Sequence, residues 1–287
     1  MLTPDPEIDS GRPSPLVSTD WLADHLDDPQ VRVVDCRWYL APFDLRDGLT
    51  EFEAGHIPGA VHLAWDRDIA DPARGSLNML AGPQRYAEAM GRLGIGDDTF
   101  VVTYDDHHVP VAARVWWTLQ VYGHTNAAVL DGGITAWVAE GRPTESGPPP
   151  AQSEPAPVFT PRFQPNLYAT KEQVLEAVRD QSTRLVDARM DVAYAAASGH
   201  IPGSIRVTGL GFLDDGQHWR SPDASRARIE AAGAAGAAKT ILYCGGGVAA
   251  TGAYLGWLLA GLGEGVSVYD GSWGEWEQDP STPKEAH

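Results

Sequence analysis

The chain has 287 residues, a length that suits roughly two domains of ordinary size. Apolar residues make up 43% of it and charged residues 21%, a balance that is typical of folded globular proteins and excludes collagen, coiled coils and wholesale disorder. With 39 acidic against 21 basic residues the formal net charge is -18, and a surface of this sign repels both nucleic acid and anionic lipid.

The first residues, 1–15, are biased toward Pro, Asp and Ser and predict a mobile tail. They contain neither the basic segment nor the apolar segment of a leader peptide. No apolar run in the chain approaches the roughly 18 to 20 residues that cross a bilayer. We therefore expect a cytoplasmic protein with no transit peptide and no membrane partner.

Short β-branched runs alternate with helical patterns through residues 16–142, which we assign to an N-terminal domain. The expected elements are a strand at Val31–Val34, a helix at Pro83–Leu93, a strand at Thr99–Tyr104, a helix at Val111–Val121 and a strand at Ala127–Leu130.

A proline-rich stretch follows this domain. Seven prolines and few large apolar residues occur in residues 141–163. Such a composition favours an extended, solvated chain over a packed element. We place an interdomain linker at 143–162 and a C-terminal domain at 163–287.

The C-terminal domain repeats phrases of the first in the same order. VVDCRW at 33–38 returns as LVDARM at 185–190, GHIPGA at 55–60 as GHIPGS at 199–204, and LDGGITAW at 130–137 as YDGSWGEW at 269–276. Its expected elements are helices at Lys171–Arg179, Ser225–Ala232 and Ala249–Leu262, and strands at Arg184–Asp187, Thr240–Tyr243 and Val266–Tyr269.

Strands separated by helices predict an α/β fold in each half, with a mainly parallel sheet that is flanked by helices on both faces. In such sheets ligands bind at the carboxyl ends of the strands. A ligand site is therefore expected at the carboxyl ends of the strands.

Cys244 stands at such an end, directly after a buried-type strand and before three glycines, Gly245, Gly246 and Gly247. Glycines let a loop curl with its amide N–H groups pointing inward, and the helix that follows presents its positive end to the same point. Both features favour a thiolate over a thiol. The alternative is a small, structural cysteine that packs before a glycine turn. The combination of strand, cysteine, glycine loop and helix is much rarer than any one part, and this favours a reactive cysteine.

A nucleotide-binding loop and a structural role for paired cysteines are both disfavoured. A P-loop needs a Lys and a Ser or Thr after its last glycine, where this chain has Val248 and Ala249. The only two cysteines, Cys36 and Cys244, are too few for a disulfide framework or an all-cysteine zinc site. A reactive cysteine here would act as a single thiol.

These motifs together resemble the tandem-domain rhodaneses, the thiosulfate and 3-mercaptopyruvate sulfurtransferase family. The resemblance rests on the Asp-x-Arg strand ends at Asp35–Arg37 and Asp187–Arg189, the two GHIPG turns, the DGG and DGS turns and the cysteine loop, and it runs from about Pro15 to Pro280. It implies two tandem rhodanese-like domains. Asp105 stands in the first copy where Cys244 stands in the second, so the first copy should be catalytically silent.

The resemblance also implies a mechanism and its ligands. The Cys244 thiolate would take the sulfane sulfur of a small-molecule donor as a persulfide and pass it to cyanide, to a thiol or to a protein thiol. No metal and no organic cofactor is implied. The residues implied to bind the persulfide or the donor are Gly245, Gly246, Gly247, Val248, Ala249, Arg189 and Trp273.

The choice of donor stays open between thiosulfate and 3-mercaptopyruvate. The loop CGGGVAA has no basic side chain and is closer to the mercaptopyruvate branch, in which an arginine at the position of Arg189 holds the donor carboxylate. Yet Gly246 and Ala249 replace that branch's serine and threonine, Asn78 stands where it often has histidine, and its second arginine is missing.

Two rival functions follow from the fold. A cysteine phosphatase needs C-x5-R to clamp the phosphoryl oxygens, but Ala250 occupies the arginine position. A non-catalytic module that binds a partner protein remains the alternative, because the family's Ser, His and second Arg are absent.

The other tempting residues have structural readings. Cys36 has no glycine cradle and reads as a packed thiol. Arg37 reads as the partner of an acidic residue in its own domain. We expect a solvated loop at Asp105, Asp106, His107 and His108. His56 and His200 are expected to be structural histidines, and most of the tryptophans are expected to serve packing.

Overall fold

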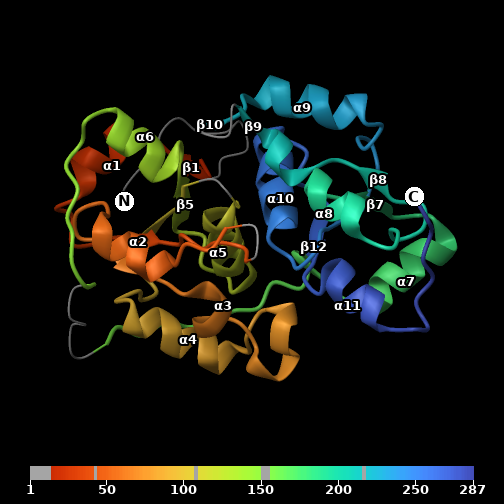
Figure 1. Cartoon of the computed structure of the whole chain (residues 1–287), viewed down its shortest axis with the longest axis horizontal. Coiled ribbons are helices and arrows are strands. Elements are labelled where there is room, and N and C mark those ends of the chain that lie inside the picture. The colour runs from red at the N-terminus through yellow and green to blue at the C-terminus, as the bar shows by residue number, and fades with distance from the viewer. Residues whose placement is uncertain (1–13, 42–43, 107–108, 150–155, 215–217) are drawn as a thin grey trace. The chain divides into compact units, whose positions relative to one another are not determined.

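The computed structural model describes residues 14–41, 44–106, 109–149, 156–214 and 218–287 (Figure 1). The chain forms two compact units. Of the described residues, the first unit takes those up to Ala70, Ala81–Phe163 and His218, and the second takes Asp71–Leu80, Gln164–Asp214 and Trp219–His287. The expected tail lies almost wholly outside the described residues, as do His107 and His108.

The first unit is built on a five-stranded sheet in the order β1-β5-β4-β2-β3, and every neighbouring pair is parallel. Its strands are β1 (Leu16–Val17), β2 (Val31–Asp35), β3 (Val61–His62), β4 (Phe100–Tyr104) and β5 (Ala127–Leu130). Its helices are α1 (Thr19–His25), α2 (Gly48–Ala54), α3 (Trp65–Asp68), α4 (Pro83–Arg92), α5 (Val111–Val121) and α6 (Gly133–Ala139).

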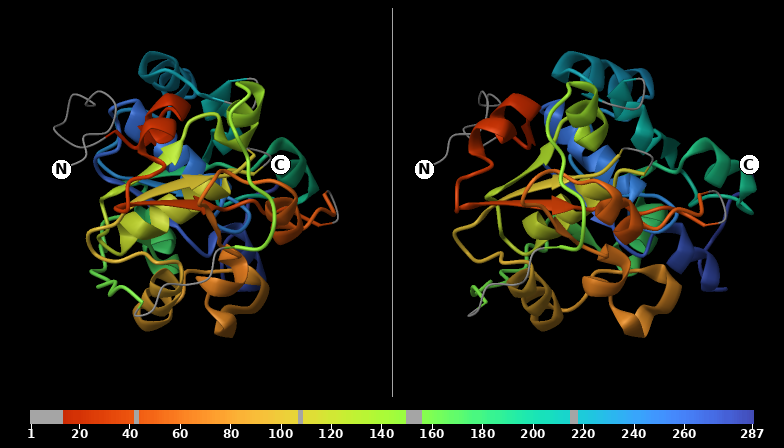
Figure 2. Two further views of the ribbon diagram at one scale, coloured as in Figure 1. Left: turned by 90° about the vertical axis from the view of Figure 1, so that its left-hand side faces the viewer. Right: turned by 60° about the vertical axis from the view of Figure 1, so that its left-hand side comes forward.

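Helices lie on both sides of the first sheet (Figure 2). Alternate residues of β4 point to opposite faces, and Phe100, Val102 and Tyr104 pack in one cluster with side chains of α1, α2 and α6. Helix α5 contacts β4 and β5, and its Val121 is fully buried. All five residues of β4 are buried for this reason, which explains their continuous apolar run.

The second unit repeats the plan with the strand order β6-β12-β11-β7-β8, again parallel throughout. Its strands are β6 (Tyr168–Ala169), β7 (Arg184–Asp187), β8 (Ile205–Arg206), β11 (Thr240–Tyr243) and β12 (Val266–Tyr269). Its helices are α7 (Lys171–Asp180), α8 (Asp191–Ala196), α9 (Pro222–Ala231), α10 (Ala249–Leu259) and α11 (Ser272–Gln278), with a 3-10 helix, η2, at Gly209–Phe212. Outside the two five-stranded sheets, β9 (Leu213–Asp214) and β10 (His218–Trp219) form a two-stranded ribbon.

The expected fold class is confirmed, and the expected elements occur with small shifts at their ends. Helix α9 begins at Pro222, earlier than expected, because the Ser221 side chain caps it and proline suits the first helical turn. Helix α10 ends at Leu259 rather than Leu262, and Gly261 just beyond it has φ +68°. The short edge strands and several short helices were not predicted, because two-residue strands leave no periodic signal.

The proline-rich stretch is extended where it is described, but it is not fully solvated. Glu145 forms an antiparallel bridge with His56 of the first GHIPG turn. Phe159 is 5% exposed and its ring lies 5.6 Å from that of Tyr86. Both ends of the linker expected at 143–162 therefore pack on the first unit.

Residues Asp71–Leu80 belong to the second unit although they fall within the N-terminal domain of the sequence repeat. This segment contains a 3-10 helix, η1, at Pro72–Leu77. This segment therefore belongs to the first copy by sequence but packs with the second unit. None of the helices in the described residues is both long enough and apolar enough to span a membrane.

Candidate active site

Cys244 lies at the carboxyl end of β11, a strand whose four residues are all buried. The cysteine itself is 2% exposed, and α10 begins five residues later at Ala249. Gly247 has φ +78°, a conformation that favours glycine and turns the loop into the helix. Beside Gly245 and Gly246 nothing lies within 4 Å of where a Cβ would stand, so this side of the loop is open.

The first turn of α11 holds the cysteine loop from the neighbouring strand end. The Trp273 N–H donates to the Cys244 carbonyl at 2.9 Å, and the Gly274 N–H donates to the Gly245 carbonyl at 2.9 Å. The Cys244 N–H in turn donates to the Ser272 Oγ at 3.0 Å. Cys244 is therefore fixed through both its N–H and its carbonyl.

Ser272 is a site residue that sequence reasoning missed. It is fully buried and has φ +52°, a left-handed conformation that is costly for a residue with a side chain. Its hydroxyl lies 2.8 Å from the Tyr269 carbonyl and 3.9 Å from the Cys244 Sγ. The shorter contact takes the hydroxyl proton, so Ser272 acts on Cys244 chiefly by accepting the N–H bond.

The first copy shows the same framework with a different occupant. Asp105 is 1% exposed, so the expectation of a solvated loop is wrong at this residue. Its carbonyl accepts from the Ile134 N–H at 3.0 Å, as the Cys244 carbonyl accepts from Trp273. Its Oδ2 accepts from the Ala112 N–H at 2.7 Å, in the first turn of α5. A carboxylate thus supplies the negative charge at a helix N-terminus where the second copy has a thiol.

Cys36, the other thiol, is completely buried at the end of β2. Burial raises the pKa of the Cys36 thiol well above its usual value, and the Asp35 and Asp105 carboxylates raise it further. A thiol in such surroundings stays protonated and inert.

Arg189 is 1% exposed and pairs with Asp187, two residues before it. Its Nε lies 3.0 Å from both carboxylate oxygens, and its Nη2 donates to the Gly199 carbonyl at 3.0 Å. Arg37 repeats this arrangement with Asp35 and Gly55 in the copy that lacks a nucleophile. The ion pair is therefore a structural feature of both copies. Of the guanidinium nitrogens of Arg189, Nη1 is the one that is available to donate a hydrogen bond to a ligand.

Two buried N–H donors near the cysteine loop have no hydrogen-bond partner among the described residues, the Arg189 Nη1 and the Trp273 Nε1. The Arg189 Cζ lies 4.9 Å from the centroid of the Trp273 ring, so the two groups are neighbours. The first copy has Ile134 at the position of Trp273 and hence no indole donor there. Buried donors without partners are costly, which makes this pair notable.

The segment 71–80 also lies against α11 within the second unit. The Leu80 N–H donates to the Asp270 Oδ2 at 2.7 Å, and the Leu77 side chain lies 3.2 Å from where a Cβ on Gly274 would stand. Arg74, whose side chain is 48% exposed, is 3.4 Å from Glu275. Asn78 adopts a left-handed conformation at φ +49° in the same segment.

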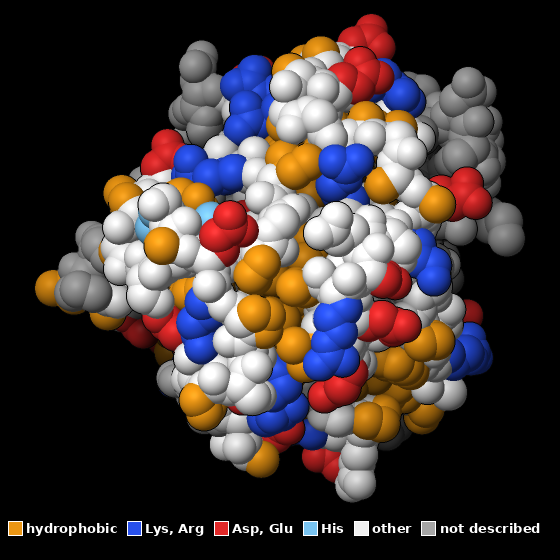
Figure 3. Space-filling view, turned by 90° about the vertical axis from the view of Figure 1, so that its right-hand side faces the viewer, with side chains coloured by type: hydrophobic (Ala, Val, Ile, Leu, Met, Phe, Trp, Pro, Cys, Tyr) orange, Lys and Arg blue, Asp and Glu red, His pale blue; other side chains and the backbone are white. Residues whose placement is uncertain are grey.

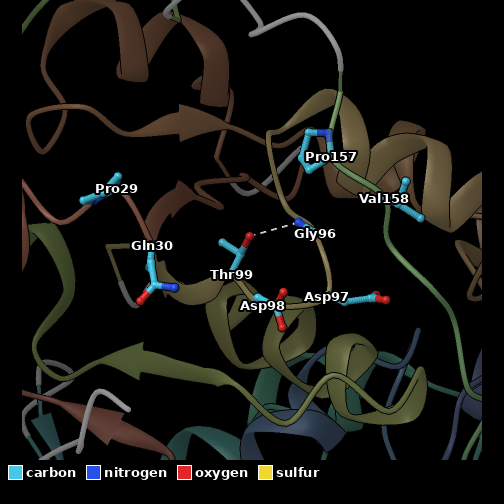
Figure 4. Close-up of a pocket in the computed structure, with 8 residues that line it drawn as sticks. All are labelled: Pro29, Gln30, Gly96, Asp97, Asp98, Thr99, Pro157 and Val158. Atoms are coloured by element: carbon cyan, nitrogen blue, oxygen red, sulfur yellow. Dashed lines mark hydrogen bonds between the residues drawn. The ribbon is translucent and has the colours of Figure 1, made fainter.

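The hollow shown in Figure 4 is not part of this site. It lies in the first unit at the amino ends of β2 and β4, lined by residues such as Gln30, Asp98, Thr99 and Pro157. Thr99 accepts a hydrogen bond from the Gly96 N–H there. The lining carries no cysteine and no basic side chain, so it offers nothing for sulfur chemistry.

The GHIPG histidines have the surroundings of structural residues. The His56 ring stacks on Phe52 with centroids 3.8 Å apart, and His200 lies 3.5 Å from Glu285. Within the described parts of the chain no three His, Cys, Asp or Glu residues are arranged to hold a metal ion.

Comparison with known proteins identifies the family of the chain. A model of the rhodanese-like domain matches residues 18–140 and again 170–279. Thiosulfate sulfurtransferase of Rattus norvegicus is 36% identical over 279 residues, and 3-mercaptopyruvate sulfurtransferase of Homo sapiens is 34% identical over 277 residues, each alignment covering 91% of both chains. The crystal structure of SseA from Escherichia coli, a representative of the 3-mercaptopyruvate sulfotransferases, is 30% identical, with a TM-score of 0.81 over 91% of this chain and 99% of that one. The chain therefore belongs to the rhodanese-like sulfurtransferases and carries two copies of their domain.

Proposed function

We propose that this enzyme moves a sulfane sulfur from thiosulfate or 3-mercaptopyruvate to a thiophilic acceptor through a persulfide on Cys244. The observation that carries the proposal is the position of Cys244, between the end of β11 and the first turn of α10, with its backbone clamped by α11. Relatives named for each of the two donors match the chain about equally well.

In the first step the Cys244 thiolate attacks the outer sulfur of the donor and a new S–S bond forms. With thiosulfate the original S–S bond breaks and sulfite leaves with the electron pair. With 3-mercaptopyruvate the C–S bond breaks, and the pyruvate enolate that leaves takes up a proton. The terminal persulfide sulfur carries negative charge, which the amides of Gly245, Gly246, Gly247, Val248 and Ala249 and the positive end of α10 stabilise.

In the second step an acceptor nucleophile attacks the outer sulfur and Cys244 leaves as a thiolate. Cyanide becomes thiocyanate, and a thiol becomes a persulfide. Both steps are nucleophilic displacements at sulfur, and neither requires a metal or an organic cofactor.

Donor binding falls to the two buried N–H groups without partners. The Arg189 Nη1 and the Trp273 Nε1 can each donate to an oxygen of a carboxylate or a sulfonate, groups that the two donors carry at the end remote from the transferred sulfur. The ion pair with Asp187 keeps the Arg189 guanidinium in place for this contact. Nothing lies within 4 Å of where a Cβ on Gly246 would stand, which supports a donor site that is open beside the loop backbone.

The test is persulfide formation on the intact protein. Incubation with either donor should add one sulfur atom to Cys244 by intact mass spectrometry, and cyanide should then release thiocyanate. Cys244→Ser should abolish both results and the matched variant Cys36→Ser should preserve both. Failure of wild-type protein to gain sulfur from either donor would favour a module that binds a partner protein without catalysis.

A comparison of kcat/KM for the two donors then decides between them. The discharge of the persulfide to a small thiol or to a protein thiol, followed by the same mass measurement, identifies the class of acceptor.

A further inference from the structure

Two arginines of the second unit contact the same glycine. Arg220 precedes α9, and its Nε donates to the Gly211 carbonyl at 2.8 Å. Arg228, near the end of α9, lies with its guanidinium against the Gly211 Cα, so closely that a Cβ there would stand 2.0 Å from Nη2. Glycine at position 211 is therefore what leaves room for the second guanidinium.

Neither arginine is neutralised. Among the residues that the structure describes, Arg220 and Arg228 form no ion pair, and the Arg228 Nε is buried without a hydrogen-bond partner. Burial lowers the pKa of Arg228 and repulsion from Arg220 lowers it further, against a smaller opposing effect of Asp191. Asp191 itself pairs with Arg206.

The contrast with Arg226, two residues away on the same helix, is informative. Arg226 bonds the Ala260 carbonyl at 2.7 Å and lies 4.0 Å from Glu230, as an arginine on an acidic protein is expected to do. The chain has 39 acidic residues for 21 basic ones, so carboxylates are plentiful. The contact of Arg228 with the Phe212 ring, at 5.8 Å, is at the outer limit of a cation–π interaction and does not compensate for the repulsion.

We propose that Arg220 and Arg228 form a binding site for a small, doubly charged oxyanion of the sulfate type, separate from Cys244. Guanidinium groups present parallel N–H donors that match the oxygens of such an anion, and two positive charges match its two negative ones. Nucleic acid is not the ligand, because the chain is strongly acidic and the basic side chains in Figure 3 lie scattered among acidic and apolar ones.

The site adjoins the nucleophile's helix. Gly209, in the same 3-10 helix η2 as Gly211, lies so close to the first residue of α10 that a Cβ would stand 2.1 Å from the Ala249 carbonyl. The 3-10 helix η2 thus contacts the two arginines through Gly211 and the first residue of α10 through Gly209. The proposal does not depend on catalysis and would hold for a protein whose Cys244 is inactive.

Thermal unfolding with sodium sulfate, compared with sodium chloride at equal ionic strength, tests the site. Wild-type protein and Cys244→Ser should each gain about 3 °C in Tm from saturating sulfate over chloride. Arg228→Gln should lose this gain and the matched control Arg226→Gln should keep it. Equal gains in both arginine variants would mean a general salt effect and would overturn the proposal.

Two further measurements keep the test decisive. Without sulfate, Arg228→Gln should melt no lower than wild type, because it removes a repelling charge; a larger loss than in Arg226→Gln would assign Arg228 a purely structural role. Gly211→Ala, at a backbone conformation that alanine tolerates, should push the Arg228 guanidinium aside and also remove the sulfate response. A full response in Gly211→Ala would contradict the geometry.

Discussion

Replacement of Ser272 separates the cost of its backbone conformation from the value of its hydroxyl. Ser272→Ala keeps the left-handed backbone at φ +52° and leaves the buried Cys244 N–H without its acceptor, a loss of about 2 kcal/mol. Ser272→Gly loses the same hydrogen bond but relieves backbone strain of about 1 kcal/mol. The free energy of unfolding should therefore fall in both variants, and by less in the glycine variant.

The effect on chemistry should be the same in both variants, since both release the Cys244 backbone. We expect alkylation of Cys244 by iodoacetamide, and kcat/KM with either donor, to fall tenfold to about a hundredfold. Urea unfolding and alkylation followed by mass spectrometry measure the two effects separately. Gly133→Ala is the matched control, because it places a side chain at φ +54° in the first copy, where it should cost stability without slowing alkylation.

Wild-type alkylation in Ser272→Gly, with a normal folded state, would refute the idea that this hydroxyl positions the nucleophile. A glycine variant less stable than the alanine variant would refute the assignment of strain to position 272.

Three further predictions concern the two thiols, the loop and the indole. Because burial raises the pKa of Cys36, iodoacetamide at pH 8 should label native protein once, on Cys244, and a second label before unfolding would contradict the packing. Gly246→Lys should fold, because nothing lies within 4 Å of its added Cβ, and its charge should raise kcat/KM for thiosulfate about tenfold; no change would show that charge in the loop does not select the donor. Trp273→Phe keeps the ring and removes the N–H, so KM for the donor should rise about tenfold with alkylation of Cys244 unchanged, whereas an unaltered KM would remove Trp273 from donor binding.

The elements that could be predicted from sequence are those whose local residue pattern reflects their structure. The β11 run is apolar because both faces of the sheet are covered, and Gly247 serves the left-handed turn that leads into the helix. Ser272 carried a weaker signal that was available, since the DGG phrase of the first copy becomes DGS in the second. The packing of residues 71–80 in the second unit and the contacts of Gly211 carried no such signal, because they depend on segments far apart in the chain.

The two copies act as an internal control for what catalysis requires. Their sheets have the same strand order, and each has an Asp-x-Arg ion pair, a histidine bridged to a glutamate and a strand-end residue whose carbonyl is held by the next helix. These shared features maintain the fold, because the first copy has them without a nucleophile. At the strand end itself, Asp105, Gly133 and Ile134 of the first copy become Cys244, Ser272 and Trp273 of the second. The first replacement supplies the thiol, the second holds its backbone at the cost of strain, and the third adds a buried N–H donor beside it, so each of these three differences involves a group that can act on sulfur or on its donor.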